Sequence, residues 1–150
     1  MRTIRAAAFA DVDALTLYRL LRLRVAVFVV EQECAYLELD GRDLEPATVH
    51  LWIDDDAGTG EPVAYLRILT EADGTIRLGR VVTAPAHRGE GHAAALVRYA
   101  LALTAPTAAV LDAQSHLTGW YEELGFEIAG AEYLDDGIRH TPMRLVRAPC

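Results

Sequence analysis

The chain has little of what marks secreted, zinc-bound or membrane-spanning proteins. It contains two cysteines, Cys34 and Cys150, which lie far apart and outside any C-x-x-C spacing. Neither a disulfide framework nor a zinc site is therefore indicated. No apolar run approaches the roughly 18 residues that cross a bilayer, and the longest one near the start, residues 6–10, is stopped by Asp11 and Asp13. We expect a protein of the reducing cytoplasm, with no secretory signal, no membrane partner and no metal.

An excess of basic residues is also missing. The formal net charge of -8 at pH 7 argues against nucleic acid as a partner, because phosphate contacts need a basic face. Acidic residues concentrate between Glu31 and Glu45, a segment whose one basic residue is Arg42. An acidic rim would attract a cationic acceptor such as an amine. A solvated acidic loop that keeps the protein soluble explains the same composition.

At 150 residues, with 52% hydrophobic and 24% charged residues, the chain has the size and composition of one soluble globular domain, residues 1–150. Hydrophobic periodicity and turn signals predict its elements. The predicted strands are residues 3–6, 49–54, 63–70, 76–83, 108–111, 126–134 and 139–146, and the predicted helices are 11–28, capped by Asp11, 93–103 and 116–124. This alternation predicts an α/β architecture in which a mixed sheet carries helices on both faces.

A glycine-containing loop, Arg88-Gly89-Glu90-Gly91-His92-Ala93, lies between a predicted strand and a predicted helix. Glycines at the start of a helix leave backbone N–H groups uncovered. Several donors and the positive end of the helix dipole can then point at one anion. The loop therefore predicts a binding site for a diphosphate.

Two other interpretations fit the same loop. Gly89-x-Gly91-x-x-Ala94 matches the dinucleotide fingerprint, with Asp112 as the acid that binds the ribose. Against this, Pro85 and further residues separate the strand from the first glycine, and few residues remain to build a second half. The third interpretation is a plain turn that starts a helix.

A second motif favours the diphosphate site through a family resemblance. Trp120-Tyr121-Glu122-Glu123-Leu124-Gly125-Phe126, together with the segment 81–93, resembles the GNAT superfamily of N-acetyltransferases. Further segments are similar to the ElaA group within that superfamily, and the resemblance covers nearly the whole chain. These segments are Leu23-Arg24, residues 27–32, residues 40–44, His50, residues 113–116 and residues 136–140.

The resemblance implies a GNAT acyl-CoA N-acyltransferase fold: a mostly antiparallel, twisted α/β sheet with a splayed pair of parallel strands and helices on both faces. Backbone groups of Val81, Val82 and Thr83 would pair with the pantetheine of acetyl-CoA, and one N–H would polarise the acyl carbonyl. Gln114 would face the pantetheine. The diphosphate would be surrounded by Arg88, Gly89, Glu90, Gly91, His92 and Ala93, although His92 stands where relatives commonly carry a small or aliphatic residue.

Acyl transfer from a thioester to an amine needs two proton transfers. An ammonium with a pKa near 10 must lose a proton, and a thiolate with a pKa of about 8.5 leaves more easily when it is protonated. The resemblance makes Tyr121 the acid. We expect Glu31 to be the base, with His50, His116, His140 or a water chain as alternatives. Asp40, His140 and His116 are expected to shape the acceptor site.

The leading functional hypothesis is direct transfer of an acetyl group from acetyl-CoA to a primary amine of a small molecule or peptide, without a covalent intermediate. Nothing beside Cys34 in the sequence activates it as a nucleophile. The alternatives are a non-catalytic acyl-CoA-binding or sensing domain, an acyl-homoserine-lactone synthase-like acyltransferase and, last, a dinucleotide-binding oxidoreductase. The sequence is compatible with a homodimer. The identity of the acceptor stays open.

Overall fold

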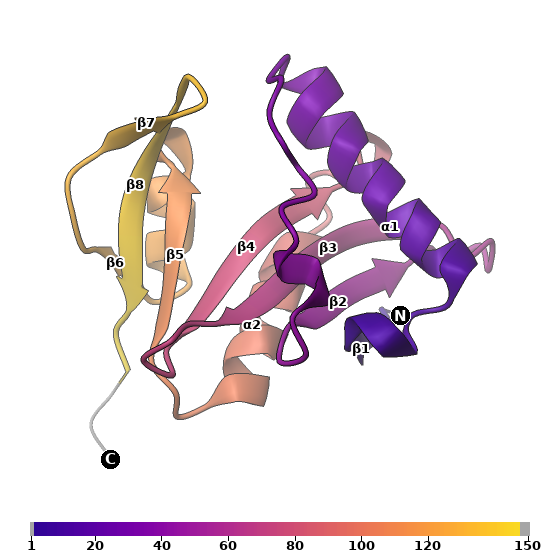
Figure 1. Cartoon of the computed structure of the whole chain (residues 1–150), viewed down its shortest axis with the longest axis horizontal. Coiled ribbons are helices and arrows are strands. Elements are labelled where there is room, and N and C mark those ends of the chain that lie inside the picture. Colours follow the sequence, from indigo (N-terminus) through magenta and orange to yellow (C-terminus); the bar gives the residue numbers. More distant parts are fainter. Residues whose placement is uncertain (1, 148–150) are drawn as a thin grey trace.

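The computed structural model describes residues 2–147, within which the chain forms one eight-stranded sheet flanked by helices (Figure 1). Cys150 lies outside the described residues. The elements, in chain order, are β1 (Ile4–Ala7), α1 (Ala14–Val25), β2 (Val49–Asp54), β3 (Pro62–Thr70), β4 (Ile76–Thr83), α2 (His92–Thr104), β5 (Ala109–Gln114), α3 (Thr118–Glu123), β6 (Phe126–Ile128), β7 (Tyr133–Asp135) and β8 (Ile138–Leu145).

The strands follow the order β1-β2-β3-β4-β5-β8-β6, and β7 pairs with β8 at the side of this path. All the pairs are antiparallel except β4 with β5. This is the expected mostly antiparallel sheet with one parallel pair, and the prediction of the fold class is confirmed. No helix in residues 2–147 has the length and apolar character that crossing a membrane requires.

Two hydrophobic cores cover the two faces of the sheet. On one face, Leu20, Leu23 and Val27 pack against Trp52, Tyr65 and Val82. On the other face, Leu96, Val97 and Ala100 of α2 join the larger core. Because strand β3 lies between both cores, it is buried from Pro62 to Leu69 and reads as a nearly continuous apolar run.

The first helix differs from its prediction at both ends. Its N-cap is Asp13 rather than Asp11, because the Asp13 side chain accepts a hydrogen bond from the Thr16 N–H at 2.8 Å. The α-helix ends at Val25 and continues as a π-helical turn, Ala26–Glu31. A wider turn shifts the side chains that follow it relative to α-helical spacing, so the positions of Glu31 and Gln32 could not be obtained from helical periodicity.

The prediction of one strand over residues 126–134 is wrong. The segment forms two short strands, β6 and β7, which pair with different parts of β8. The Ala129 N–H donates to the Pro142 carbonyl at 2.8 Å, so the side of Pro142 that lacks an N–H faces β6. The ladder ends there because proline has no donor to continue it. The predicted hairpin turn between β7 and β8 is present, with Asp136 and Gly137 both at positive φ.

Strands β4 and β5 separate soon after they start. Their pairing comprises Ile76 with Ala109 and Arg77 with Val110. Beyond this point β4 contains a bulge, since its register with β3 shifts next to Arg80, a non-glycine residue at φ +52°. A bulge bends and twists the strand that carries it. Beyond this point β4 and the β5–β8 half of the sheet diverge (Figure 1).

A buried ion network fixes the geometry next to the bulge. The Arg24 side chain, 1% exposed, donates to Glu38 at 2.6 Å and to Asp43 at 2.8 Å. Arg67 donates to Asp43 at 3.2 Å and to Asp40 at 2.6 Å. Burial acts to raise the pKa of Asp43, but the hydrogen bond and charge of Arg24 and the charge of Arg67 outweigh it and hold that pKa below its usual range.

We expect Asp43→Asn to lower the free energy of unfolding by about 3 kcal/mol at pH 7, because it leaves two buried guanidinium groups with too little negative charge. Urea unfolding measures this loss. The contribution of Asp43 is present above the unfolded-state pKa of about 3.9 and disappears as the pH falls through the lower pKa of the folded state. The difference between the variant and the natural protein should therefore shrink at acid pH.

Asp56→Asn is the matched control, because Asp56 is exposed in the β2–β3 loop. We expect its effect to stay within about 0.5 kcal/mol. Equal losses in the two variants would contradict a stabilising role for the buried network.

Candidate functional site

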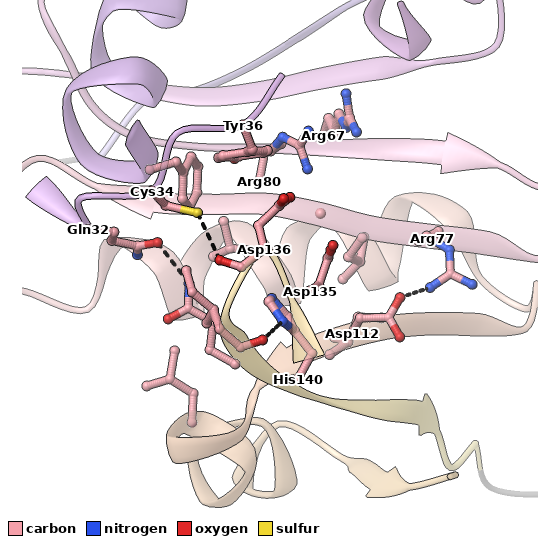
Figure 2. A pocket seen from close by; sticks show the side chains of 18 of the residues that line it. Gln32, Cys34, Tyr36, Arg67, Arg77, Arg80, Asp112, Asp135, Asp136 and His140 are labelled. Atoms are coloured by element: carbon pink, nitrogen blue, oxygen red, sulfur yellow. Dashed lines mark hydrogen bonds and ion pairs between the residues drawn. The ribbon is translucent and has the colours of Figure 1, made fainter. Parts of the chain in front are cut away.

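A cavity of about 230 Å³ lies where β4 and β5 separate (Figure 2). Its walls come from the segment after α1, from strands β3, β4 and β5, from α3 and from the β7–β8 hairpin. Of the residues predicted for the site, four line this cavity: Val81, Gln114, Tyr121 and His140. Segments far apart in the sequence thus meet at the place that the splayed strands create.

The edge of β4 that faces this opening is the predicted site for pantetheine. On its other edge, Val82 pairs with Tyr65 and Thr83 with Ala64 of β3. On the open edge, pairing with β5 within the described residues stops at Arg77. The Val81 side chain lines the cavity, whereas Val82 is buried against α1. The main-chain groups on this open edge beyond Arg77 are therefore available for an extended ligand, as in strand addition.

The glycine loop has the backbone geometry expected of an anion site. Gly89 has φ +81° and Gly91 has φ +80°, a region in which residues with a Cβ are strained. Gly91 is the N-cap of α2 and provides no capping side chain. The first N–H groups of α2, from His92 and Ala93 onward, consequently lack a side-chain acceptor from the cap and can serve a bound anion.

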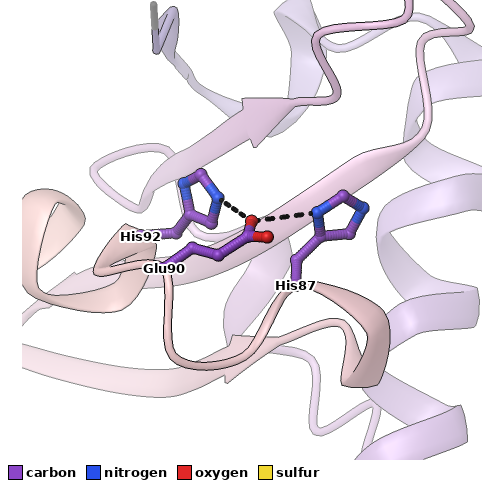
Figure 3. Close-up of side chains that lie close together, drawn as sticks. All are labelled: His87, Glu90 and His92. Carbon is purple, nitrogen blue, oxygen red and sulfur yellow. Dashed lines mark hydrogen bonds and ion pairs between the residues drawn. The ribbon is translucent and has the colours of Figure 1, made fainter.

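Three side chains of this loop form a cluster (Figure 3). Glu90 Oε1 lies 2.9 Å from His92 Nε2 and 3.2 Å from His87 Nδ1. These hydrogen bonds, that of His92 first, lower the pKa of Glu90. The three ligand atoms lie within 4.8 Å of one another, so the cluster could hold a cation. The expectation that the site contains no metal stays a prediction.

Arg2 makes a cation an unfavourable occupant of this cluster. Its Nε donates to His92 Nδ1 at 3.1 Å, which fits a His92 ring whose proton sits on Nε2 and points at Glu90. Its Nη2 donates to the Glu90 carbonyl and would lie 3.1 Å from a Cβ placed on Gly91. A guanidinium and a helix N-terminus together favour an anion here. No local sequence pattern indicated a role for Arg2, because it lies 88 residues before Glu90 in the chain.

Glu31 and Arg88, predicted for different roles, bind each other. Two parallel hydrogen bonds of 2.8 Å join the guanidinium of Arg88 to the carboxylate of Glu31. The hydrogen bond and charge of Arg88 lower the pKa of Glu31, although burial acts in the opposite direction. Glu31 also lies outside the residues that line the cavity. This pairing makes Glu31 a weaker proton acceptor than the sequence suggested.

Tyr121, the predicted acid, lies in the wall of the cavity and is 6% exposed. Its ring packs edge to face with those of Trp120 and Phe126, with ring centroids 4.8 and 6.0 Å away. Burial raises the pKa of Tyr121 to about 12. The hydroxyl therefore stays protonated at neutral pH, which is the state that a proton donor needs.

Two residues expected in the acceptor site do not line the cavity. Asp40 binds Arg67 at 2.6 Å and lies 3.4 Å from Arg80, so it positions these two arginines of the cavity wall. His116 is exposed in the short turn Ser115–Leu117. His140, the third expected residue, lines the cavity.

The acidic segment 31–45 does not form the predicted rim of free negative charge, because most of its carboxylates are paired with arginines. The pairs are Glu31 with Arg88, Glu38 with Arg24 and Arg80, Asp40 with Arg67, Asp43 with Arg24 and Arg67, and Glu45 with Arg42. Asp135 and Asp136 of the β7–β8 turn line the cavity instead. In the sequence these two residues indicated only a turn, and no pattern placed them in the cavity wall.

Residues 24–147 match the family model described as an acetyltransferase (GNAT) domain. The chain belongs to the GNAT acetyltransferase family. Protein ElaA of Escherichia coli is 39% identical over 142 residues, which cover 89% of this chain and 90% of ElaA. A UPF0039 protein of Mycobacterium tuberculosis is 47% identical over 136 residues, or 89% of this chain and 86% of that protein.

Solved structures agree with this GNAT assignment. The crystal structure of E. coli ElaA has a TM-score of 0.88 at 34% identity and covers 97% of this chain and 100% of its own. An acyl-CoA N-acyltransferase from Pseudomonas aeruginosa has a TM-score of 0.86 at 40% identity, with 96% and 99% coverage. The resemblance to the ElaA group is thus confirmed. An aminoglycoside 6'-N-acetyltransferase complexed with coenzyme A, 14% identical, shares the fold with a TM-score of 0.73.

Gly91→Val tests the loop. We expect acetyl-CoA binding, measured by isothermal titration calorimetry, to weaken at least about tenfold, because the strained φ and the new side chain next to Arg2 disturb the donors at the start of α2.

Gly74→Val is the matched control, since Gly74 has φ +88° in the turn before β4, outside the loop and the cavity. It should lower the melting temperature through the same kind of strain and leave the dissociation constant unchanged. An unchanged dissociation constant of acetyl-CoA in Gly91→Val would show that the loop is not part of the binding site.

Proposed function

We propose that this chain transfers an acetyl group from acetyl-CoA directly to the primary amine of a small molecule or peptide. The observation that carries the proposal is the separation of β4 from β5, which opens a cavity lined by Tyr121 and His140 beside a free strand edge. Membership of the GNAT family supports acyl-CoA as the donor. The choice of acetyl as the acyl group and of an amine as the acceptor are part of the proposal.

The residues present fit an acyl-CoA molecule. The open edge of β4 at Val81, Val82 and Thr83 suits the extended pantetheine, and the loop from Arg88 to Ala93 suits the diphosphate. The bound thioester supplies an electrophilic carbonyl carbon and a thiolate leaving group. A main-chain N–H of β4 would polarise the carbonyl oxygen. Gln114, whose amide donates to Gln32 at 3.3 Å, faces the same space.

Tyr121 is the proposed acid. The phenol is kept protonated by its pKa of about 12 and lies in the cavity wall. Because this pKa exceeds that of a thiol, about 8.5, by several units, the hydroxyl first stabilises the developing thiolate as a hydrogen-bond donor. Transfer of its proton to sulfur is completed when an amine proton of the reacting acceptor replaces it.

Direct transfer is favoured over a covalent acyl-enzyme. Cys34 also lines the cavity, but its thiol is buried and donates a hydrogen bond to the Asp136 carbonyl oxygen at 3.3 Å. A nucleophilic cysteine needs the thiolate form and a cationic or basic neighbour. A carbonyl oxygen provides neither.

The volume and the polar wall of the cavity favour acetyl transfer over two of the alternative functions. A non-catalytic acyl-CoA sensor should have its acceptor space filled by large side chains, whereas this cavity measures about 230 Å³. An acyl-homoserine-lactone synthase-like enzyme needs an apolar tunnel for a long acyl chain. The cavity wall contains Arg67, Arg77, Arg80, Asp112 and Asp135, which suit a polar acceptor better.

Release of coenzyme A from acetyl-CoA in the presence of polyamines, amino acids, simple amines and peptides with a free N-terminus tests the function. We expect at least one amine to accelerate release over the rate of hydrolysis, with the acetylated product visible by mass spectrometry. Tight acetyl-CoA binding without acceleration by any amine would favour the sensor.

Tyr121→Phe should lower kcat about 100-fold or more, because it removes the donor for the departing sulfur. The dissociation constant of acetyl-CoA should stay within about twofold, since Tyr121 lies in the cavity wall and not in the glycine loop. Tyr18→Phe is the control, because Tyr18 is 66% exposed on α1. Equal turnover in both variants would exclude Tyr121 as the acid.

A further inference from the structure

The tautomer of His140 is fixed by a main-chain contact. Its Nδ1 lies 2.8 Å from the carbonyl oxygen of Ile138. A carbonyl oxygen only accepts hydrogen bonds, so Nδ1 must carry the proton and the neutral ring must have its lone pair on Nε2. Within residues 2–147, no hydrogen bond engages Nε2.

The position of the ring is also fixed. His140 lies opposite Gln114 in the β5–β8 ladder, at the end of β5. Its ring stacks on that of Tyr133, with ring centroids 5.8 Å apart and an angle of 24° between the planes. Figure 2 shows it among the side chains of the cavity wall, with its hydrogen bond to a main-chain oxygen. An oriented imidazole with one free lone pair thus lies in the same cavity as Tyr121.

The other candidate bases are engaged or lie elsewhere. Glu31 is bound to Arg88, outside the cavity. Both nitrogens of His50 are hydrogen-bonded, Nδ1 to the Tyr65 hydroxyl and Nε2 to the Asp43 carbonyl, and its burial lowers its pKa. Among the charged groups of the cavity wall, Asp112 is paired with Arg77.

Asp135 and Asp136 also line the cavity. A carboxylate, with an ordinary pKa near 4, accepts a proton from an ammonium less readily than an imidazole, whose ordinary pKa is about 6.5. Their negative charge instead favours the binding of a cationic acceptor. The two residues therefore support a histidine base rather than replace it.

We propose that Nε2 of His140 is the general base that takes a proton from the acceptor ammonium. This inference rests on the proposed acetyl transfer. An acceptor R–NH3+ has two protons to lose as it becomes an amide. One passes to His140 Nε2 and then to solvent, and the other ends on the sulfur by way of Tyr121, while the C–N bond forms and the C–S bond breaks. The products are the amide, coenzyme A as a thiol and one proton.

His140→Asn is the decisive variant. The asparagine amide can keep the hydrogen bond to Ile138 that Nδ1 makes, but it has no basic nitrogen in place of Nε2. With spermidine, lysine and a peptide N-terminus as probe acceptors, we expect kcat/KM at pH 7 to fall about 100-fold. The dissociation constant of acetyl-CoA should be unchanged.

The pH profile separates catalysis from a structural role. In the natural protein, kcat/KM should rise with pH as one group loses its proton, and then level off. In His140→Asn it should keep rising about tenfold per pH unit toward the pKa of the amine, because only the free amine reacts. Arg139→Gln, the neighbour on β8 with a 73% exposed side chain, is the control and should keep the natural profile.

Long-range ¹H–¹⁵N spectra of the imidazole test the geometry without turnover. They should show that the neutral His140 ring carries its proton on Nδ1. The opposite tautomer would overturn the proposal.

The kinetic outcomes keep the two proposals apart. Suppose that the natural protein acetylates an amine and that His140→Asn keeps both the natural rate and the pH at which kcat/KM levels off. The base is then not His140, and acetyl transfer stands. If kcat/KM no longer levels off with pH in Glu31→Gln, while His140→Asn keeps the pH profile of the natural protein, the base is Glu31. If the natural protein binds acetyl-CoA and no amine accelerates release of coenzyme A, acetyl transfer itself fails.

Discussion

A largely buried, alternating set of arginines and carboxylates is the constraint on which the rest of the structure depends. Arg24 binds Glu38 and Asp43, and Arg67 joins Asp43 to Asp40. Arg80 completes the set, with its Nε 2.6 Å from a Glu38 oxygen and Nη2 donating to the Glu38 carbonyl at 3.0 Å. The cost of desolvating each charge is offset only while its neighbours remain in place. The set therefore acts as one unit that ties α1 and the segment after it to β3 and β4.

This network also explains where the site is. Arg80 is the left-handed residue next to the bulge in β4, and its guanidinium is held by the acidic segment after α1. Holding Arg80 there stabilises a backbone conformation that is unfavourable by itself. The bulge bends β4, whose pairing with β5 extends only to Arg77 within the described residues. The cavity thus results from a strand irregularity that is held in place by buried charge.

The opening lies between main-chain groups on one side and side chains on the other. On the side formed by β4 and α2, the available groups are main-chain donors. Their geometry requires glycine at residues 89 and 91 and depends little on other side chains. The remaining wall consists of side chains such as Tyr121, His140 and Asp135. Main-chain geometry can persist while side chains change, so a structure with 14% identity shares the fold. In the proposed function, the choice of acceptor would depend on these side chains.

The sequence predicted features whose physical cause is local. The glycine loop and the helix after it depend on neighbouring residues, and the loop and Tyr121 also belong to the motifs that indicated the family. The strand over residues 126–134 was mispredicted because its break depends on Pro142, which lies in another strand. The acidic segment was misinterpreted for the same kind of reason: its partners Arg24, Arg67 and Arg80 come from α1, β3 and β4. Arg88, the partner of Glu31, lies 57 residues further along the chain.

By itself, the sequence determined the alternation of helices and strands, the glycines at the start of α2 and membership of the family, because each of these is written in short-range patterns. Only the tertiary structure decided which ionisable groups are free to react. Glu31 is engaged by Arg88, and the tautomer of His140 is fixed by the Ile138 carbonyl. The reason is physical: whether a group accepts or donates a proton depends on partners within a few ångströms, and the fold brings these partners together from distant parts of the chain.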